Sequence, residues 1–280
     1  AQTCRTVYTS FFRSEITNKT LAWFASQDYP ERYANWHREW CLPALEMALS
    51  ATHHDVSLAF YRSFWLDYIY DESADKWFMF SNHRWTEMGQ MINLRKSLSE
   101  DLVRKYESVR ITLARQIRDS NDSNVKEIGE LTLDKIAKLI SKLKNDSFKG
   151  SVVKNSREFF NNKNFIRLLD CNPNLTGVVN GVIEVCGKIC LFRAAKPEDY
   201  ISMCSLNKYD DSYNWNHPSV KALMKWLGQV FIEKELLHYF LKFAASCLKA
   251  RNSDKIFAIW TGSGDNSKSM IVKLFTYTLG

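Results

Sequence analysis

Residues 255–275 have the sequence KIFAIWTGSGDNSKSMIVKLF, and this stretch decides how the C-terminal part of the chain is interpreted. An apolar run of strand length at 255–260 leads into a loop at 262–267 that contains two glycines. Lys268 and Ser269 follow, and after them comes an amphipathic segment with helical spacing. The order strand, glycine-rich turn, Lys-Ser and helix predicts a phosphate-binding (Walker A) loop.

The chemistry of such a loop assigns a role to each conserved type of side chain in the pattern. Glycines let the backbone curl until successive N–H groups point at phosphate oxygens, and the new helix adds the positive end of its dipole. Lys268 is expected to reach the β- and γ-phosphates, and the Ser269 hydroxyl to bind Mg²⁺. ATP and Mg²⁺ are therefore the expected cofactors. The predicted nucleotide-binding residues are Gly262, Gly264, Asn266, Ser267, Lys268 and Ser269.

One residue departs from the general pattern G-x-x-x-x-G-K-[ST]. Ser267 stands where that pattern has glycine, and a side chain there would strain the turn or crowd the phosphates. Hydrolysis also needs an acidic group at the end of a separate strand. Asp254 and Asp265 lie too close to the loop to supply it. The catalytic residues are expected beyond residue 280, so the chain by itself is expected not to be a competent ATPase.

Positive charge is concentrated in the middle of the chain. The net charge of +7 comes mainly from residues 95–167, which hold 17 basic against 10 acidic residues, whereas residues 1–94 hold 8 against 11. A local positive field suits a polyanion such as DNA, and a solvated helical face of mixed charge is the alternative. The candidate DNA-binding residues are Lys135, Lys138, Lys142 and Lys144.

The first half of the chain is predicted to be largely helical, because Gly and Pro are scarce and apolar residues recur every three or four positions. Helices are expected over 31–50, with a break or kink at Pro43, and over 54–70. The aromatic residues of these helices are expected in a core, with base stacking as the alternative. Two further helices, over 94–117 and 128–143, are separated by a break in the sequence DSNDSN.

Shorter elements complete the prediction. A loop is expected at 145–151, and a strand at 76–80. Short strands at 178–185 and 189–192 are expected to meet at a Gly187-Lys188 turn, which would let Cys186 and Cys190 face each other. Two helices, about 217–229 and 232–249, precede the loop.

The seven cysteines include no CxxC pair, which disfavours zinc and suggests buried thiols in a reducing compartment. No stretch of about 18 apolar residues exists, so no membrane partner is expected.

With these residues in view, the chain resembles the poxvirus-type primase-helicases of nucleocytoplasmic large DNA viruses, and within them the asfarvirus member most. The likeness lies in residues 54–85, 169–209 and 231–269. The last stretch is similar to the loop of superfamily III helicases, written GxGxNGKS, with Ser267 replacing its final glycine.

The resemblance implies a mainly α fold with a small β component. It implies a helical linker at 1–50 and a helicase-associated (collar) domain at 51–215, with basic helices at 90–167 and a hairpin region at 178–193. Residues 216–280 would be a helical lead-in and the first strand, P-loop and helix of an α/β AAA+-like ATPase domain.

As a whole, such a protein would be an ATP-dependent DNA helicase that unwinds single-stranded or forked DNA as a homo-hexameric ring. It would work with other viral replication proteins in the host cytoplasm, and it could be carried in the virion. The alternative is a non-catalytic oligomerisation or DNA-binding module whose phosphate loop has degenerated at Ser267.

Overall fold

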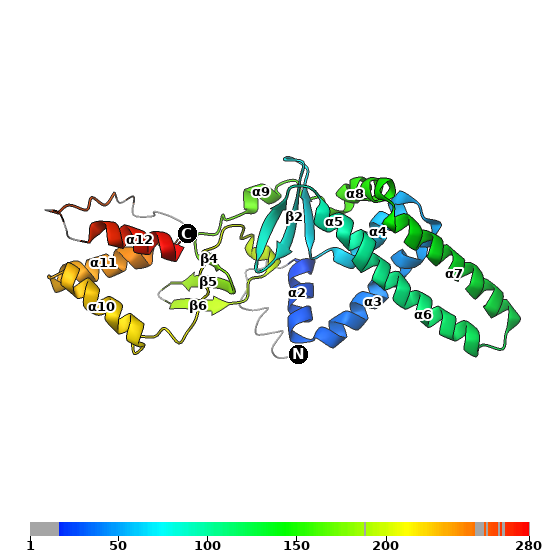
Figure 1. The fold of residues 1–280 in the computed structure, drawn as a ribbon, viewed down its shortest axis with the longest axis horizontal. Coiled ribbons are helices and arrows are strands. Elements are labelled where there is room, and N and C mark those ends of the chain that lie inside the picture. The colour runs from blue at the N-terminus through cyan, green and yellow to red at the C-terminus, as the bar shows by residue number, and fades with distance from the viewer. Residues whose placement is uncertain are drawn as a thin grey trace. The chain divides into compact units, whose positions relative to one another are not determined.

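The computed structural model describes residues 17–187, 189–249, 255, 257–262, 264 and 267–279 (Figure 1). These residues form two compact units. One contains the described residues up to Phe80 together with Thr86–Ile166, and the other contains Ser81–Trp85 and the described residues from Arg167 onward. Helices dominate and two small sheets accompany them, as the mainly α prediction requires.

The first unit is built from helices and one sheet. Its helices are α2 (Asn18–Asp28), α3 (Pro30–Met47), a 3₁₀ turn (Ala48–Ser50), α4 (His53–Phe64), α5 (Ile92–Lys96), a π-helical segment (Ser97–Leu102), α6 (Val103–Asp119), α7 (Ser123–Lys144), α8 (Asp146–Phe160) and α9 (Phe165–Leu168), whose last residues belong to the second unit. The strands are β1 (Tyr68–Asp71), β2 (Lys76–Ser81) and β3 (Arg84–Met88), and they form one sheet in that order.

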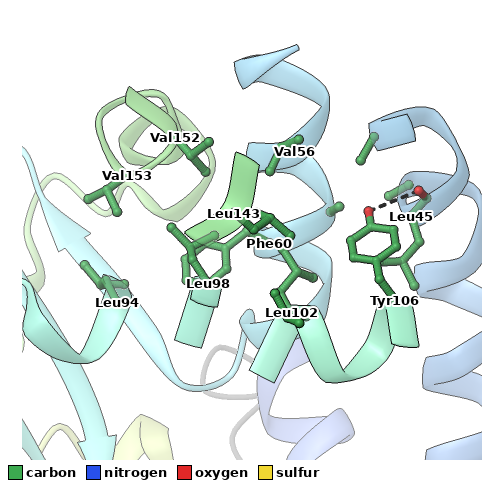
Figure 2. Close-up of a cluster of buried hydrophobic side chains, with 14 of the residues drawn as sticks. Leu45, Val56, Phe60, Leu94, Leu98, Leu102, Tyr106, Leu143, Val152 and Val153 are labelled. Atoms are coloured by element: carbon green, nitrogen blue, oxygen red, sulfur yellow. Dashed lines mark hydrogen bonds between the residues drawn. The ribbon is translucent and has the colours of Figure 1, made fainter. Parts of the chain in front are cut away.

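The core of this unit forms because several helices carry apolar side chains at three- and four-residue spacing and turn them toward one another (Figure 2). Phe60 from α4 lies among Leu98 and Leu102, all completely buried. Tyr106 is almost fully buried, and its hydroxyl donates a hydrogen bond to the carbonyl oxygen of Leu45, at 3.1 Å. That bond satisfies a polar group that would otherwise be costly in this apolar setting.

Helices α6 and α7 form a hairpin (Figure 1). The predicted break is confirmed: α6 ends at Asp119, and the Asp122 side chain caps α7 by accepting from the Asn124 amide, at 2.9 Å. The two helices approach closely at Gly129, where a Cβ atom would lie 2.5 Å from Ile117 Cγ1.

A buried carboxylate ties the sheet to the segment that follows α8. Asp71 is fully buried at the end of β1, and it accepts hydrogen bonds from the Ser73 hydroxyl and from the amides of Ala74 (3.1 Å) and Ile166 (2.9 Å). Burial pushes the pKa of this carboxyl upward, but these donors outweigh it and hold the pKa below its ordinary value. Asp71 therefore stays ionised and joins β1 to the start of α9.

The described residues of the second unit form another three-stranded sheet and the helices α10 to α12. Its elements are β4 (Leu175–Val178), β5 (Gly181–Cys186), β6 (Ile189–Arg193), a 3₁₀ turn (Pro197–Asp199), α10 (Pro218–Val230), α11 (Lys234–Ser246) and α12 (Lys268–Leu279). The three strands pair antiparallel in the order β4-β5-β6. The strand predicted at 189–192 is confirmed as β6, whereas the range 178–185 is divided by a turn at 179–180 between the end of β4 and β5. In this register Cys186 is opposite Ile189 and Cys190 is opposite Val185. Because successive side chains alternate between the faces of a sheet, the two cysteines lie on opposite faces, and the prediction that they face each other is wrong.

An ion pair fixes the segment that follows β6. The guanidinium of Arg193 bridges both carboxylate oxygens of the buried Asp199 at 2.7 and 2.8 Å, and its Nε donates to Glu184 at 2.5 Å. Bidentate pairing of this kind fixes orientation as well as charge. The turn at Pro197–Asp199 is thus held against β5 and β6.

Three boundaries differ from the prediction. The helix expected over 54–70 ends at Phe64, because Tyr68–Asp71 pairs with β2 and is buried at every position. In a strand that is buried on both faces, apolar residues follow one another without alternation. Tyr68 in this strand therefore also fits the four-residue spacing of Phe60 and Phe64. Helix α3 also passes through Pro43 without ending there. Tertiary packing on both sides of Pro43, through the buried Cys41 and Ala44, keeps the helix continuous.

The loop expected at 145–151 is the first turns of α8. Asn145 is its N-cap, and the Asn145 side chain accepts from the Phe148 amide at 3.1 Å. Asn followed by Asp and Ser is a helix-start signal as well as a turn signal. None of the described helices is long and apolar enough to pass through a lipid bilayer.

Candidate nucleotide-binding loop

Two described residues of the predicted loop, Gly264 and Ser267, have positive φ angles. Gly264 has φ +100°, and a Cβ atom built there would meet nothing within 4 Å. Ser267, the residue that replaces glycine, has φ 61°, in the left-handed region. The predicted strain at Ser267 is therefore present, because L-residues pay a steric cost in this region. Of the other predicted residues in the loop, Asn266 lies outside the described residues.

Helix α12 starts directly at the predicted lysine. The Ser267 carbonyl accepts from the amides of Met270 (3.1 Å) and Ile271 (3.0 Å), which makes Ser267 the residue before the first helical turn. Lys268 Nζ donates to the carbonyl oxygen of Gly262, at 3.4 Å, so the ammonium group lies near the residue at which the predicted loop begins. Ser269 is exposed on the first turn. The loop thus brings Gly262, Lys268 and the helix start together.

The position of α12 is set by packing with the two preceding helices. Ile271 is buried with Leu227 of α10 and Phe240 of α11, and Phe275 makes ring contacts with Phe240 and Trp260. This small apolar cluster holds the helix from one side. At the N-terminal end of α12, Ser269 and Met270 are exposed.

The strand expected at 255–260 is not found in the described residues of that range. Residues 255 and 257–260 have no strand conformation, and the side chains of Phe257 and Ile259 are 87% and 73% exposed. A strand needs a neighbour for its backbone hydrogen bonds, and neither described sheet includes this segment. The prediction of a buried strand from this apolar run is therefore wrong for the described residues of the range.

The predicted DNA-binding lysines lie on α7, in the first unit. Lys135 and Lys144 are exposed, Lys138 pairs with Asp134 at 2.6 Å, and Lys142 Nζ lies 5.8 Å from the centroid of the Phe148 ring. Helical geometry places residues 135, 138 and 142 on one flank of α7 and residue 144 on another. The structure therefore groups three of the four lysines.

A row of arginines on α6 was not predicted from the sequence. At 100° per residue, Arg104, Arg115 and Arg118 share one sector of the helix surface. The side chains of Arg104 and Arg118 are 74% and 76% exposed, although each pairs with a neighbouring aspartate. The signal was present as the spacing of arginines along 104–118, opposite the buried Tyr106.

In this chain a helical unit precedes the loop that contains Gly262, Gly264 and Lys268. A family model described as D5 N terminal like matches residues 57–232, well over half of the chain. The chain belongs to this family.

Relatives in large DNA viruses agree with this family. A helicase by name from Acanthamoeba polyphaga mimivirus is 32% identical over 270 residues, which cover 95% of this chain and 28% of that protein. A helicase by name from invertebrate iridescent virus 3 is 25% identical, with coverage of 93% and 31%. A primase by name from African swine fever virus is 23% identical, with coverage of 70% and 20%.

These relatives confirm the predicted resemblance to the primase-helicases of large DNA viruses. The identity to the mimivirus protein exceeds that to the asfarvirus protein, so the comparisons support the group and not an asfarvirus assignment within it. The chain spans less than a third of the length of each of these three relatives.

Proposed function

We propose that this chain is part of a replicative primase-helicase that couples ATP hydrolysis to movement along DNA. The observation that supports the proposal most is the loop that ends in Lys268 at the start of α12, within a chain of the D5 N terminal like family. The names of the relatives support a helicase or primase role in the replication of a large DNA virus. The activity of the whole protein goes beyond this chain and is part of the proposal.

The described residues of the loop are suited to a nucleoside triphosphate with Mg²⁺. Gly264 leaves open space where a side chain would stand, and the start of α12 presents the positive end of a helix dipole. Lys268 would exchange its contact with the Gly262 carbonyl for the β- and γ-phosphate oxygens, and Ser269 would hold the metal ion. When bound, the magnesium nucleotide supplies the phosphoryl group whose cleavage drives the motor.

Hydrolysis requires groups that we assign to other parts of the protein. An acidic residue on a separate strand and a positive group for the γ-phosphate complete such a site. We propose that these groups lie beyond residue 280 and that the protein acts as a homo-hexameric ring. The helical first unit would form the collar of that ring, in the replication compartment of the host cytoplasm.

DNA binding is assigned to the basic surface of the α6–α7 hairpin. Lys135 and Lys142 lie on one flank of α7, and they and Arg115 on α6 are exposed and take part in no ion pair among the described residues. Such groups can replace the counterions of a phosphate backbone, which makes binding salt-dependent. The double variant Lys135→Gln, Lys142→Gln should reduce the magnitude of the slope of log affinity against log salt on single-stranded DNA by about 1.4.

A matched control for this charge change is available on α10. Lys221 and Lys225 are exposed, and the double variant Lys221→Gln, Lys225→Gln removes the same charge from the second unit. It should leave the salt slope unchanged. Equal slopes for both double variants and the wild type would remove the α6–α7 hairpin from the DNA-binding assignment.

The helicase proposal is tested by unwinding in the full-length protein. Lys268→Ala removes the ammonium group that would bind the phosphates, so ATP-dependent strand separation of a forked DNA should be lost. Lys273→Ala, one turn and a half further along α12, is a control that changes the same charge. Unwinding by Lys268→Ala at the wild-type rate would end the helicase assignment.

A second function is favoured by one observation, the serine in a left-handed conformation at position 267. A non-catalytic oligomerisation or DNA-binding module would tolerate a strained, weakly binding loop. Filter binding separates the two functions: DNA affinity that falls steeply with salt but does not respond to ATP favours the module.

A further inference from the structure

The C-terminal end of α12 accepts hydrogen bonds from side chains of a segment of the second unit that is distant in the sequence. The Ser205 hydroxyl donates to the carbonyl oxygen of Thr278, at 2.7 Å. The Asn207 side-chain amide donates to the carbonyls of Tyr277, at 2.5 Å, and Thr278, at 3.2 Å. The last carbonyls of a helix have no partner within the helix. Ser205 and Asn207 therefore cap α12 from about 70 residues away in the sequence.

The capping segment is itself fixed to the small sheet. The Ser205 amide donates to the Gly177 carbonyl at 2.9 Å, and the Val179 amide donates to the Asn207 carbonyl at 3.1 Å. The fit is close, because a Cβ atom on Gly177 would lie 2.6 Å from the carbonyl oxygen of Met203. The segment thus runs along β4 as an attached strand-like edge and cannot shift independently of the sheet.

Further bonds on both sides of Asn207 strengthen this attachment. The Tyr209 backbone amide donates to Asn180 Oδ1 at 2.9 Å, and Asn180 Nδ2 donates back to the Tyr209 carbonyl oxygen at 2.9 Å. The Ser205 hydroxyl also accepts from the Asn207 side-chain amide at 3.1 Å. The donor that reaches α12 is therefore oriented by its own neighbours.

We infer that Asn207, oriented by Ser205, is a positioning residue for nucleotide binding at the other end of α12. This inference rests on the proposed function of the loop. A helix of 12 residues is about 18 Å long and stiff, so fixing its C-terminal end on the β4–β6 sheet also fixes the place of Lys268 and Ser269. The apolar contacts of Ile271 and Phe275 hold one side of the helix, and the hydrogen bonds to Tyr277 and Thr278 fix its C-terminal end in addition.

The contact requires a hydrogen-bond donor in the side chain at position 207. Two carbonyl oxygens at the negative end of a helix dipole require a hydrogen-bond donor. Alanine would remove the donor, whereas aspartate would keep the shape and place a carboxylate against both oxygens. Asn207→Asp should therefore be at least as harmful as Asn207→Ala, although it is the closer replacement in shape.

The experiment is a titration of the full-length protein with a fluorescent ADP analogue in the presence of Mg²⁺. Asn207→Ala should weaken the affinity about three- to tenfold, the usual worth of one or two hydrogen bonds, and Asn207→Asp by at least as much. Asn216→Ala, an exposed asparagine on the same connection, is the control and should bind like the wild type. In ATP hydrolysis, the KM should rise more than the kcat falls.

The number of binding sites separates positioning from simple loss of folding. A variant that fails to fold lowers the number of sites per subunit, whereas a displaced helix lowers affinity with the number of sites unchanged. Wild-type affinity in both Asn207 variants would overturn the inference and leave the nucleotide-binding proposal standing. Absence of nucleotide binding in the wild type would overturn the proposed function and this inference with it.

Discussion

Replacing Ser267 by glycine should stabilise the start of α12, although the substitution removes a side chain. A left-handed conformation costs an L-residue about 1–2 kcal/mol, and Ser267 has φ 61°. Glycine avoids this cost but loses about 0.5–1 kcal/mol more backbone freedom on folding. The balance favours Ser267→Gly by about 0.5–1 kcal/mol, which corresponds to a two- to fivefold change in a local equilibrium.

Hydrogen exchange measured by mass spectrometry reports this difference locally. The amides of Met270 and Ile271, which donate to the Ser267 carbonyl, should exchange about two- to fivefold more slowly in Ser267→Gly. Ser151→Gly is the control, because Ser151 is helical within α8 and glycine there should speed exchange. Unchanged or faster exchange at α12 in Ser267→Gly would refute the strain that we derive from the backbone.

Three further substitutions test the packing. Gly177→Ala should destabilise the second unit by about 1–3 kcal/mol, because the new Cβ atom would meet the Met203 carbonyl oxygen, and thermal unfolding should show it. Tyr106→Phe should cost about 1 kcal/mol in denaturant unfolding, since it leaves the buried Leu45 carbonyl without its hydroxyl donor. The lowered pKa of Asp71 stabilises the fold above about pH 4, and this contribution is lost as the pH falls through the native pKa. Asp71→Asn should therefore reduce the loss of unfolding free energy on acidification, and an unchanged acid slope would contradict the assignment.

The helices were largely predictable because their spacing reflects one buried face. Leu98, Leu102 and Tyr106 are predicted on one stripe and are buried together. The sequence did not distinguish a π-helical segment at Ser97–Leu102, because one extra residue in a turn shifts the stripe only slightly. It also could not show that Tyr68 leaves the helix, since a strand buried on both faces has no alternation of its own.

The prediction of the loop rests on a different signal, namely the order of neighbouring residues from Gly262 to Ser269. The positive φ at Ser267 follows from its place in a pattern that has glycine there. Asn207 could not be predicted, because its partners Tyr277 and Thr278 are about 70 residues away and only the fold brings them together. A polar residue in a connecting segment carries no local sign of such a contact.

A structure of the full-length protein with ADP and Mg²⁺ bound tests the central claim most directly. We predict the β-phosphate at the N-terminal end of α12, with an oxygen about 3 Å from Lys268 Nζ, and the metal ion beside the Ser269 hydroxyl. A nucleotide bound elsewhere, or a bound nucleotide with Lys268 still directed at the Gly262 carbonyl, would contradict the account.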